Sequence, residues 1–322
     1  MHTMVNGVRL FFDVAGEKVV AEGPRMRERP TLLLLHGGPG FDHSMFKPSF
    51  APLAEVAQLI YLDHRGNGRS EHGDAELWTL DQWGDDVRAF CDALGIEKPI
   101  VLGYSFGGFV AQSYATRHPD HPAKLMLYST APVLDDAPVL DAFEKIGGAE
   151  VRAVAAAYFA DRTPENTTAF RATCFPLYNT KPGDPNLSLR WIINNAVSTH
   201  FFEGEGKRFD FRPLLDRIAC PTLVVAGAKD PRCPLLFAQM IVDSIRPGLA
   251  RLAVFHECGH GPHVEEPARA IMLLRASTAT YSARVPPRYE SVRPNTRCPT
   301  DGDPRAVQPS TFSIASTPLS PR

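Results

Sequence analysis

Short, almost unbroken apolar runs recur along this chain through residue 255, and segments with helical spacing of apolar residues separate most of them. A strand that is apolar at every position must be covered on both faces, which is typical of a parallel sheet with helices on each side. The strands predicted on this basis cover residues 8–14, 31–35, 58–62, 99–102, 124–128, 222–226 and 251–255. The sequence therefore predicts an α/β fold with a mostly parallel central sheet and helices on both faces.

This alternation fails between residues 133 and 212, where the chain is helical and irregular in pattern. Helices are predicted there over 153–159 and 189–197. Ligands of open α/β sheets bind beyond the carboxyl ends of the strands. We expect residues 133–212 to form a helical cap over these ends, inserted after the sixth strand, while residues 1–132 and 213–280 form the core.

The last segment, residues 281–322, is rich in Pro, Ser, Thr and Arg and has few apolar side chains. Such a composition cannot bury enough apolar surface to offset the entropy of folding. We therefore expect a disordered tail. Its abrupt change of character is also compatible with a reading frame that runs past an ancestral domain end.

The net charge of the chain argues against some classes of binding partner. The 322 residues carry a net charge of −2 and no long block of lysine and arginine, so nucleic acid and anionic membranes are not expected partners. A small neutral substrate fits better.

No apolar run is long enough to span a membrane and no signal peptide pattern opens the chain, so the expected location is the cytoplasm. No pattern predicts the oligomeric state.

The six cysteines are scattered without a C-x-x-C pair, which argues against a disulfide framework and against a structural zinc knuckle. We expect most of them to be reduced and buried. No cofactor is predicted.

Gly103-Tyr-Ser-Phe-Gly107 follows the apolar run 100–102 and precedes a helix-like segment, 108–117. In that context a G-x-S-x-G sequence predicts a nucleophile elbow, in which a strand turns sharply into a helix and exposes the serine. Ser105 is therefore the candidate nucleophile. A plain turn serine is the alternative.

A serine hydroxyl needs a base to remove its proton, and the base needs a carboxylate to fix its tautomer. Asp230 follows the predicted strand 222–226, and His260 lies between two glycines after the strand 251–255. The chain order Ser105, Asp230, His260 is that of α/β hydrolases. We expect these three residues to form a catalytic triad, with His256 and His263 as weaker candidates for the base.

An oxyanion formed on Ser105 needs backbone N–H donors. The residue after the nucleophile, Phe106, supplies one, and the glycine-rich loop His36-Gly-Gly-Pro-Gly40 supplies the other, with Gly38 as the expected donor.

Two further motifs compete with this interpretation. His256-Glu-x-x-His260 matches a zinc-protease signature, but that signature needs a helix and the glycines and proline here disfavour one. Asp63, Arg65 and Ser70 could form a charged site, although an internally hydrogen-bonded loop is favoured.

The glycine-rich loop, the segment Asp63-x-Arg-Gly-x-Gly-x-Ser70, the elbow, Asp230 and Gly259-His260 together resemble the proline iminopeptidase-like branch of the α/β-hydrolase superfamily. The resemblance covers residues 5–276. It implies the α/β-hydrolase fold and a serine hydrolase without a metal, which forms an acyl-enzyme on Ser105 and resolves it with water.

The resemblance leaves the substrate open, since the branch includes carboxylesterases, lactone-opening enzymes, esterases that inactivate macrolide antibiotics and confer resistance, and prolyl aminopeptidases. A Trp usually follows the nucleophile in the aminopeptidases, and this chain has Phe106. We therefore expect an ester or lactone substrate. An aminopeptidase acting on short peptides with N-terminal proline is the alternative, and a silent binding protein is more remote. Candidate substrate contacts are Gly37, Tyr104, Phe201, Phe202, Glu203 and Glu205. The two glutamates could bind the amine of an aminopeptidase substrate, although solvated loop charges are favoured. The two phenylalanines could form an apolar wall for a macrocycle or belong to the core of the cap.

Overall fold

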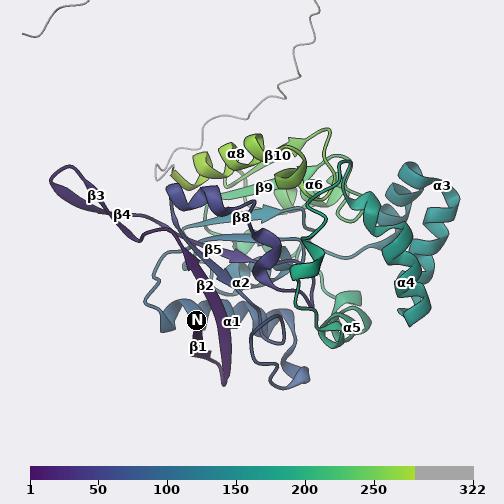
Figure 1. Cartoon of the computed structure of the whole chain (residues 1–322), viewed down its shortest axis with the longest axis horizontal. Coiled ribbons are helices and arrows are strands. Elements are labelled where there is room, and N and C mark those ends of the chain that lie inside the picture. Colours follow the sequence, from purple (N-terminus) through teal and green to yellow (C-terminus); the bar gives the residue numbers. More distant parts are fainter. Residues whose placement is uncertain (280–322) are drawn as a thin grey trace, which may run out of the picture. The chain divides into compact units, whose positions relative to one another are not determined.

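The computed structural model describes residues 1–279 and contains an eight-stranded sheet in the order β1-β2-β6-β5-β7-β8-β9-β10 (Figure 1). The strands from β6 to β10 in this order are parallel, whereas β2 is antiparallel to both β1 and β6. The strands are β1 (His2–Val5), β2 (Val8–Ala15), β5 (Thr31–Leu35), β6 (Gln58–Leu62), β7 (Ile100–Tyr104), β8 (Lys124–Tyr128), β9 (Thr222–Gly227) and β10 (Ala250–Phe255). The predicted, mostly parallel central sheet is confirmed.

Helices cover both faces of this sheet, which explains why β5 is apolar at every position after Thr31. Leu33 and Leu35 pack into one core, and Leu32 and Leu34 pack into the core on the opposite face. The first core is closed by α1 (Leu80–Ala93), α2 (Phe106–Arg117) and α6 (Leu235–Ser244), and the second by α8 (Pro267–Ala279), η1 (His43–Phe46) and η2 (Ala51–Glu55). Figure 1 shows α1 and α8 on opposite sides of the sheet.

Three short strands near the start of the chain are absent from the sequence-based prediction. They are β1 and the two strands of a separate antiparallel hairpin, β3 (Val19–Glu22) and β4 (Arg25–Glu28). The hairpin projects from the sheet (Figure 1), and every residue of β4 is exposed. A strand without a buried face carries no alternation of apolar and polar residues, so the pattern gives no sign of it.

The chain between β8 and β9 is mostly helical and contains α3 (Asp136–Ala160), α4 (Pro164–Thr173), α5 (Asn195–Glu203), η4 (Phe175–Tyr178), η5 (Ser188–Arg190), η6 (Glu205–Lys207) and η7 (Leu215–Arg217). It contacts the loops that follow β5 and β10. The Asn194 N–H donates to the Gly40 carbonyl at 2.7 Å, and the His260 N–H donates to the Tyr178 carbonyl at 2.7 Å. The insertion therefore lies at the carboxyl ends of the parallel strands. That residues 133–212 form a separate cap domain stays a prediction.

The helix predicted over residues 189–197 is wrong. η5 ends at Arg190 and α5 begins at Asn195, with extended backbone between them. The Asn194 side chain accepts a hydrogen bond from the Ala196 N–H at 3.1 Å, which caps α5. An N-cap residue has non-helical dihedrals, so the helix cannot extend backwards through it. The helix predicted over 153–159 lies within α3.

The cysteines of the described residues are free and buried, as predicted: Cys91, Cys174, Cys220, Cys233 and Cys258. Cys298 and the predicted tail, residues 281–322, lie outside the described residues. No helix within residues 1–279 has both the length and the apolar character needed to cross a membrane.

A candidate active site at the carboxyl ends of the strands

Ser105 lies at the junction of a strand and a helix. β7 ends at Tyr104 and α2 begins at Phe106, while Ser105 has φ 53° and ψ −117°. Such a backbone conformation costs a non-glycine residue on the order of 1–3 kcal/mol. Two hydrogen bonds hold it, because the Ser105 N–H donates to the Tyr128 carbonyl at 2.9 Å and its carbonyl accepts from Thr130 Oγ1 at 2.7 Å. The sharp turn predicted at this serine is present.

Glycine at positions 103 and 107 lets β7 and α2 cross very closely. A Cβ at Gly103 would lie 2.3 Å from the Gly107 carbonyl oxygen, and one at Gly107 would lie 2.0 Å from the Leu35 carbonyl oxygen. Both distances are far below van der Waals contact, so a larger residue requires the backbone to move. The crossing brings the first turn of α2 against the end of β5.

The loop that follows β5 lies beside the serine. A Cβ at Gly37 would come within 3.3 Å of the Ser105 Cβ, so the two backbones are direct neighbours. Gly38 has φ +132°, a conformation that side chains rarely adopt. Within the described residues, the N–H groups of Gly38 and Phe106 donate no hydrogen bond. Both donors of the predicted oxyanion hole are thus unused by the protein itself.

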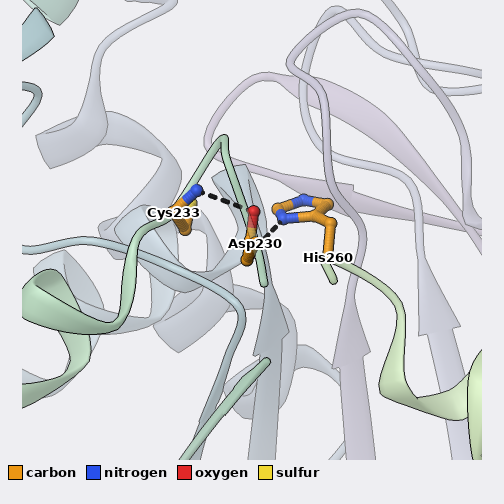
Figure 2. A group of neighbouring side chains, drawn as sticks. All are labelled: Asp230, Cys233 and His260. Atoms are coloured by element: carbon orange, nitrogen blue, oxygen red, sulfur yellow. Dashed lines mark hydrogen bonds and ion pairs between the residues drawn. The ribbon is translucent and has the colours of Figure 1, made fainter. Parts of the chain in front are cut away.

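Asp230 and His260 come together from the loops after β9 and β10. His260 Nδ1 lies 2.8 Å from Asp230 Oδ2 (Figure 2), and both residues are buried. The other carboxylate oxygen, Oδ1, accepts the N–H groups of Arg232 at 2.8 Å and Cys233 at 2.9 Å. Three partners hold the carboxylate in place, so it can fix the tautomer of the imidazole by accepting the Nδ1 proton.

The imidazole of His260 is held between two tyrosines. Its ring centroid lies 5.2 Å from that of Tyr104, the residue before Ser105, and 5.4 Å from that of Tyr178 in the insertion. Burial raises the pKa of Tyr104 well above its ordinary value, so its phenol is neutral beside the imidazole. These contacts bring His260 into the neighbourhood of Ser105.

His263 is buried in the same neighbourhood but has a different environment. Its ring packs 4.9 Å from Phe50 and 5.3 Å from Tyr104, and its Nδ1 has no hydrogen-bond partner within the described residues. Burial lowers its pKa to about 3, with a smaller contribution from His260. A neutral ring without a carboxylate partner is poorly suited to act as the base, which favours His260 for that role.

The zinc-protease signature lacks the helix that it requires. The segment from His256 to His260 is a turn and irregular chain after β10, so the two histidines do not share a helix face. Glu257 is exposed and paired with Lys229. Ligand atoms of Asp230, Cys233 and His260 do lie within 4.8 Å of one another. Burial, however, raises the pKa of the Cys233 thiol well above its ordinary value, and a metal binds the thiolate. This donor set therefore suits a metal poorly.

The segment 63–70 forms an internally hydrogen-bonded loop, the arrangement that its sequence favours. Ser70 Oγ donates to the Asp63 carbonyl at 2.6 Å, and the Asp63 carboxylate accepts the Arg69 N–H at 2.9 Å. Arg65 forms a buried, two-bonded ion pair with Asp86 at 2.7 and 2.8 Å. These side chains are satisfied within the loop and its neighbours.

The candidate substrate contacts in the insertion are dispersed. Phe201 is fully buried, with its ring 5.2 Å from that of Phe106, so it belongs to the core. Phe202 lies on the wall of a cavity. Glu203 is exposed, whereas Glu205 Oε2 accepts the Leu80 N–H at 2.7 Å.

Sequence reasoning missed the residues that support the site from a distance. Thr130 holds the Ser105 carbonyl, and the backbone of Tyr178 holds the His260 N–H. No local motif marks either residue, because each acts through a tertiary contact. Arg232 follows Asp230 by two positions, and that proximity was an available signal.

Comparison with known proteins matches residues 30–267 to the family described as alpha/beta hydrolase fold. A proline iminopeptidase of Pestalotiopsis fici is 28% identical over 84% of this chain and 96% of its own length. A 2-hydroxymuconate semialdehyde hydrolase of a Pseudomonas species is 27% identical over 80% of this chain and 92% of its own.

Solved structures agree with this fold. An esterase from Exiguobacterium antarcticum superposes with a TM-score of 0.66 at 22% identity, covering 87% of this chain and 100% of that one. A proline iminopeptidase of Mycobacterium smegmatis gives a TM-score of 0.66 at 22% identity, covering 86% and 97%. The chain belongs to the α/β-hydrolase fold family, in its proline iminopeptidase-like branch, and is a serine hydrolase.

Proposed function

We propose that this enzyme cleaves a carboxylic ester or a lactone through an acyl-enzyme formed on Ser105. The observation that carries the proposal is the buried Asp230–His260 pair, joined at 2.8 Å, whose imidazole packs 5.2 Å from the ring of Tyr104, the residue before a serine held at φ 53°. A base fixed by a carboxylate, within reach of a serine nucleophile, is the arrangement that acyl transfer requires.

In the proposed reaction His260 Nε2 takes the proton of Ser105 Oγ while that oxygen attacks the substrate carbonyl. Asp230 accepts the Nδ1 proton of His260 and stabilises the imidazolium that forms. The N–H groups of Gly38 and Phe106 donate to the oxyanion. The imidazolium then protonates the departing alcohol oxygen, and the acyl–oxygen bond of the substrate breaks. Water, deprotonated by His260, attacks the acyl carbonyl, and the imidazolium returns the proton to Ser105 Oγ as the bond between acyl group and serine breaks and the acid leaves.

An ester or lactone is favoured over an N-terminal proline amide by the surroundings of the two cap glutamates. Glu205 already binds the first N–H of α1, and Glu203 is exposed to solvent. Phe106 also stands where the aminopeptidases usually have a Trp. Macrolide lactones fall within the proposed class, but the buried Phe201 is not available as an apolar wall for them.

Prolyl aminopeptidase activity is the second candidate. Relatives of that name match most of this chain, including one from Lactobacillus helveticus at 28% identity over 84% of it. In that case the exposed Glu203 would bind the substrate amine.

The test measures kcat/KM for p-nitrophenyl butyrate and prolyl p-nitroanilide on wild type, Ser105→Ala and the exposed control Ser188→Ala. We expect a preference for the ester, a loss of at least about 10³-fold in Ser105→Ala and no change in the control. A fluorophosphonate should label wild type but not Ser105→Ala. Full ester turnover by folded Ser105→Ala would refute the mechanism, and a preference for the anilide would select the second candidate.

A further inference from the structure

A cavity of about 390 Å³ lies between the insertion and the chain that follows β9. Its apolar wall includes Phe159 and Phe202. Its charged lining comprises four cationic side chains and two carboxylates, namely Arg162, Lys207, Arg212, Arg232, Asp135 and Asp136. The cationic excess distinguishes this cavity from the chain as a whole, which is slightly acidic.

Two of these arginines converge on one aromatic ring. The Arg162 guanidinium lies 3.9 Å from the Phe202 ring centroid and 4.2 Å from that of Tyr158. The Arg232 guanidinium lies 5.8 Å from the Phe202 ring centroid and 5.7 Å from that of Phe159. Stacking on aromatic faces orients a guanidinium while leaving its N–H donors free at the edge.

Neither of these arginines has a carboxylate partner. Among the described residues, neither Arg162 nor Arg232 forms an ion pair, and Arg162 donates to the Tyr158 hydroxyl. Asp136 acts on both charges electrostatically but makes no ion pair with them. Burial lowers the pKa of the Arg162 guanidinium, whereas the pKa of Arg232 is raised because nearby groups oppose the effect of its burial.

Two of the four other charged side chains on the wall already have partners. Arg212 binds Asp210 at 2.6 Å, and Asp135 accepts the Ala137 N–H at 3.1 Å at the start of α3. Both guanidinium groups are partly shielded from water and lack a carboxylate partner, so together they are suited to bind an anionic ligand.

The cavity adjoins the candidate active site through Arg232. The backbone N–H of Arg232 donates to Asp230 Oδ1 at 2.8 Å, while its side chain lines the cavity. Tyr178, whose ring lies 5.4 Å from that of His260, is among the groups that influence the pKa of the same guanidinium. A substrate held at Ser105 could therefore extend a charged group toward the two arginines.

We propose that Arg162 and Arg232 bind a carboxylate carried by the substrate, so that the preferred ester or lactone has a free acid group. This inference rests on the proposed function. The same two charges would repel the ammonium group of an aminopeptidase substrate, which strengthens the preference for an acid-bearing ester.

The test compares two esters that differ at the far end of the acyl chain, the mono-4-nitrophenyl ester of adipic acid and 4-nitrophenyl hexanoate. The ratio of their kcat/KM values is measured in wild type, Arg162→Gln and Arg232→Gln. Arg152→Gln is the matched control, because Arg152 lies on α3 outside the cavity and is paired with Asp141 and Glu144. Binding of adipate to each folded variant is measured in parallel by calorimetry.

Wild type should prefer the acid-bearing ester, and each cavity variant should lower the ratio about tenfold or more while the control leaves it unchanged. If the variants lose thermal stability but keep the wild-type ratio of kcat/KM values, the two arginines serve only to hold the insertion on the core. The inference then fails. If neither ester is cleaved in a Ser105-dependent way, the proposed function fails. Adipate binding is then the separate test of the anion site. Binding that depends on Arg162 and Arg232 supports the anion site, and a lack of such binding overturns it.

Discussion

Two buried histidines three positions apart, His260 and His263, have opposite chemical surroundings. His260 shares a hydrogen bond of 2.8 Å with Asp230, whereas His263 has aromatic neighbours and an unpartnered Nδ1 among the described residues. A carboxylate supports the protonated form of an imidazole, and an apolar environment opposes it. The same residue type is thus suited to move a proton at one position and to stay neutral at the other.

This difference predicts how acid affects stability. The pKa of His263 is about 3 in the folded protein and 6.5 as the ordinary value, so the unfolded chain binds an extra proton between these pH values. Stability is therefore complete above pH 6.5 and falls as the pH drops towards 3. From pH 7.5 to 5.5 this residue should account for a loss of about 1.4 kcal/mol.

Urea unfolding of wild type and His263→Phe at pH 7.5 and 5.5 measures this contribution. The variant keeps an aromatic ring among Phe50, Tyr104 and Tyr128, and it should lose about 1.4 kcal/mol less than wild type on acidification. Equal losses in the two proteins would mean that His263 is protonated as readily in the folded state as in the unfolded one.

The residues proposed for catalysis could be predicted from the sequence because each stands in a local pattern. Ser105 lies in a glycine-flanked motif, and Asp230 and His260 each follow an apolar strand. Arg162 and Tyr178 stand in no such pattern. Their positions depend on how the insertion folds back onto the core, which apolar periodicity does not encode.

At the scale of elements, the crossing of β7 and α2 depends on the absence of side chains. Gly107→Ala would place a Cβ 2.0 Å from the Leu35 carbonyl oxygen. Because the obstacle is backbone in a central strand, we expect a loss of about 3 kcal/mol or more in unfolding free energy.

A second glycine separates this steric effect from backbone strain. Gly95 has φ +66° and open space where a Cβ would lie, so Gly95→Ala should cost only about 1 kcal/mol and leave activity intact. Thermal unfolding and ester turnover of the two variants provide the comparison. Similar stability in both variants would contradict the close crossing of β7 and α2.

The N-terminus of α1 depends on a residue of the insertion. Glu205 Oε2 accepts the Leu80 N–H at 2.7 Å, and a carboxylate there also interacts favourably with the helix dipole. Glu205→Ala should lower unfolding free energy by about 1 kcal/mol, whereas Glu203→Ala, at an exposed position, should change it by less than about 0.5 kcal/mol. Chemical denaturation measures both values. A raised KM for prolyl p-nitroanilide in Glu205→Ala, with unchanged stability, would instead identify an amine site.

Across the whole molecule, the strands that are buried on both faces could be predicted from the sequence, and the exposed strands could not. The apolar parallel strands, such as β5, follow directly from the need to cover both faces of the sheet. The exposed hairpin of β3 and β4 has no comparable requirement. The interruption of the strand pattern between β8 and β9 follows from the sequence, but the break at Asn194 depends on a single capping side chain.

The hydrogen bond from the His260 N–H to the Tyr178 carbonyl has a consequence for how such enzymes diversify. The segment expected to select the substrate also holds the backbone of the proposed base. Exchange of this segment between relatives, in evolution or by engineering, therefore has to preserve a carbonyl at that point in space. A graft chosen only for the shape of its pocket would be expected to bind a new substrate and turn it over slowly.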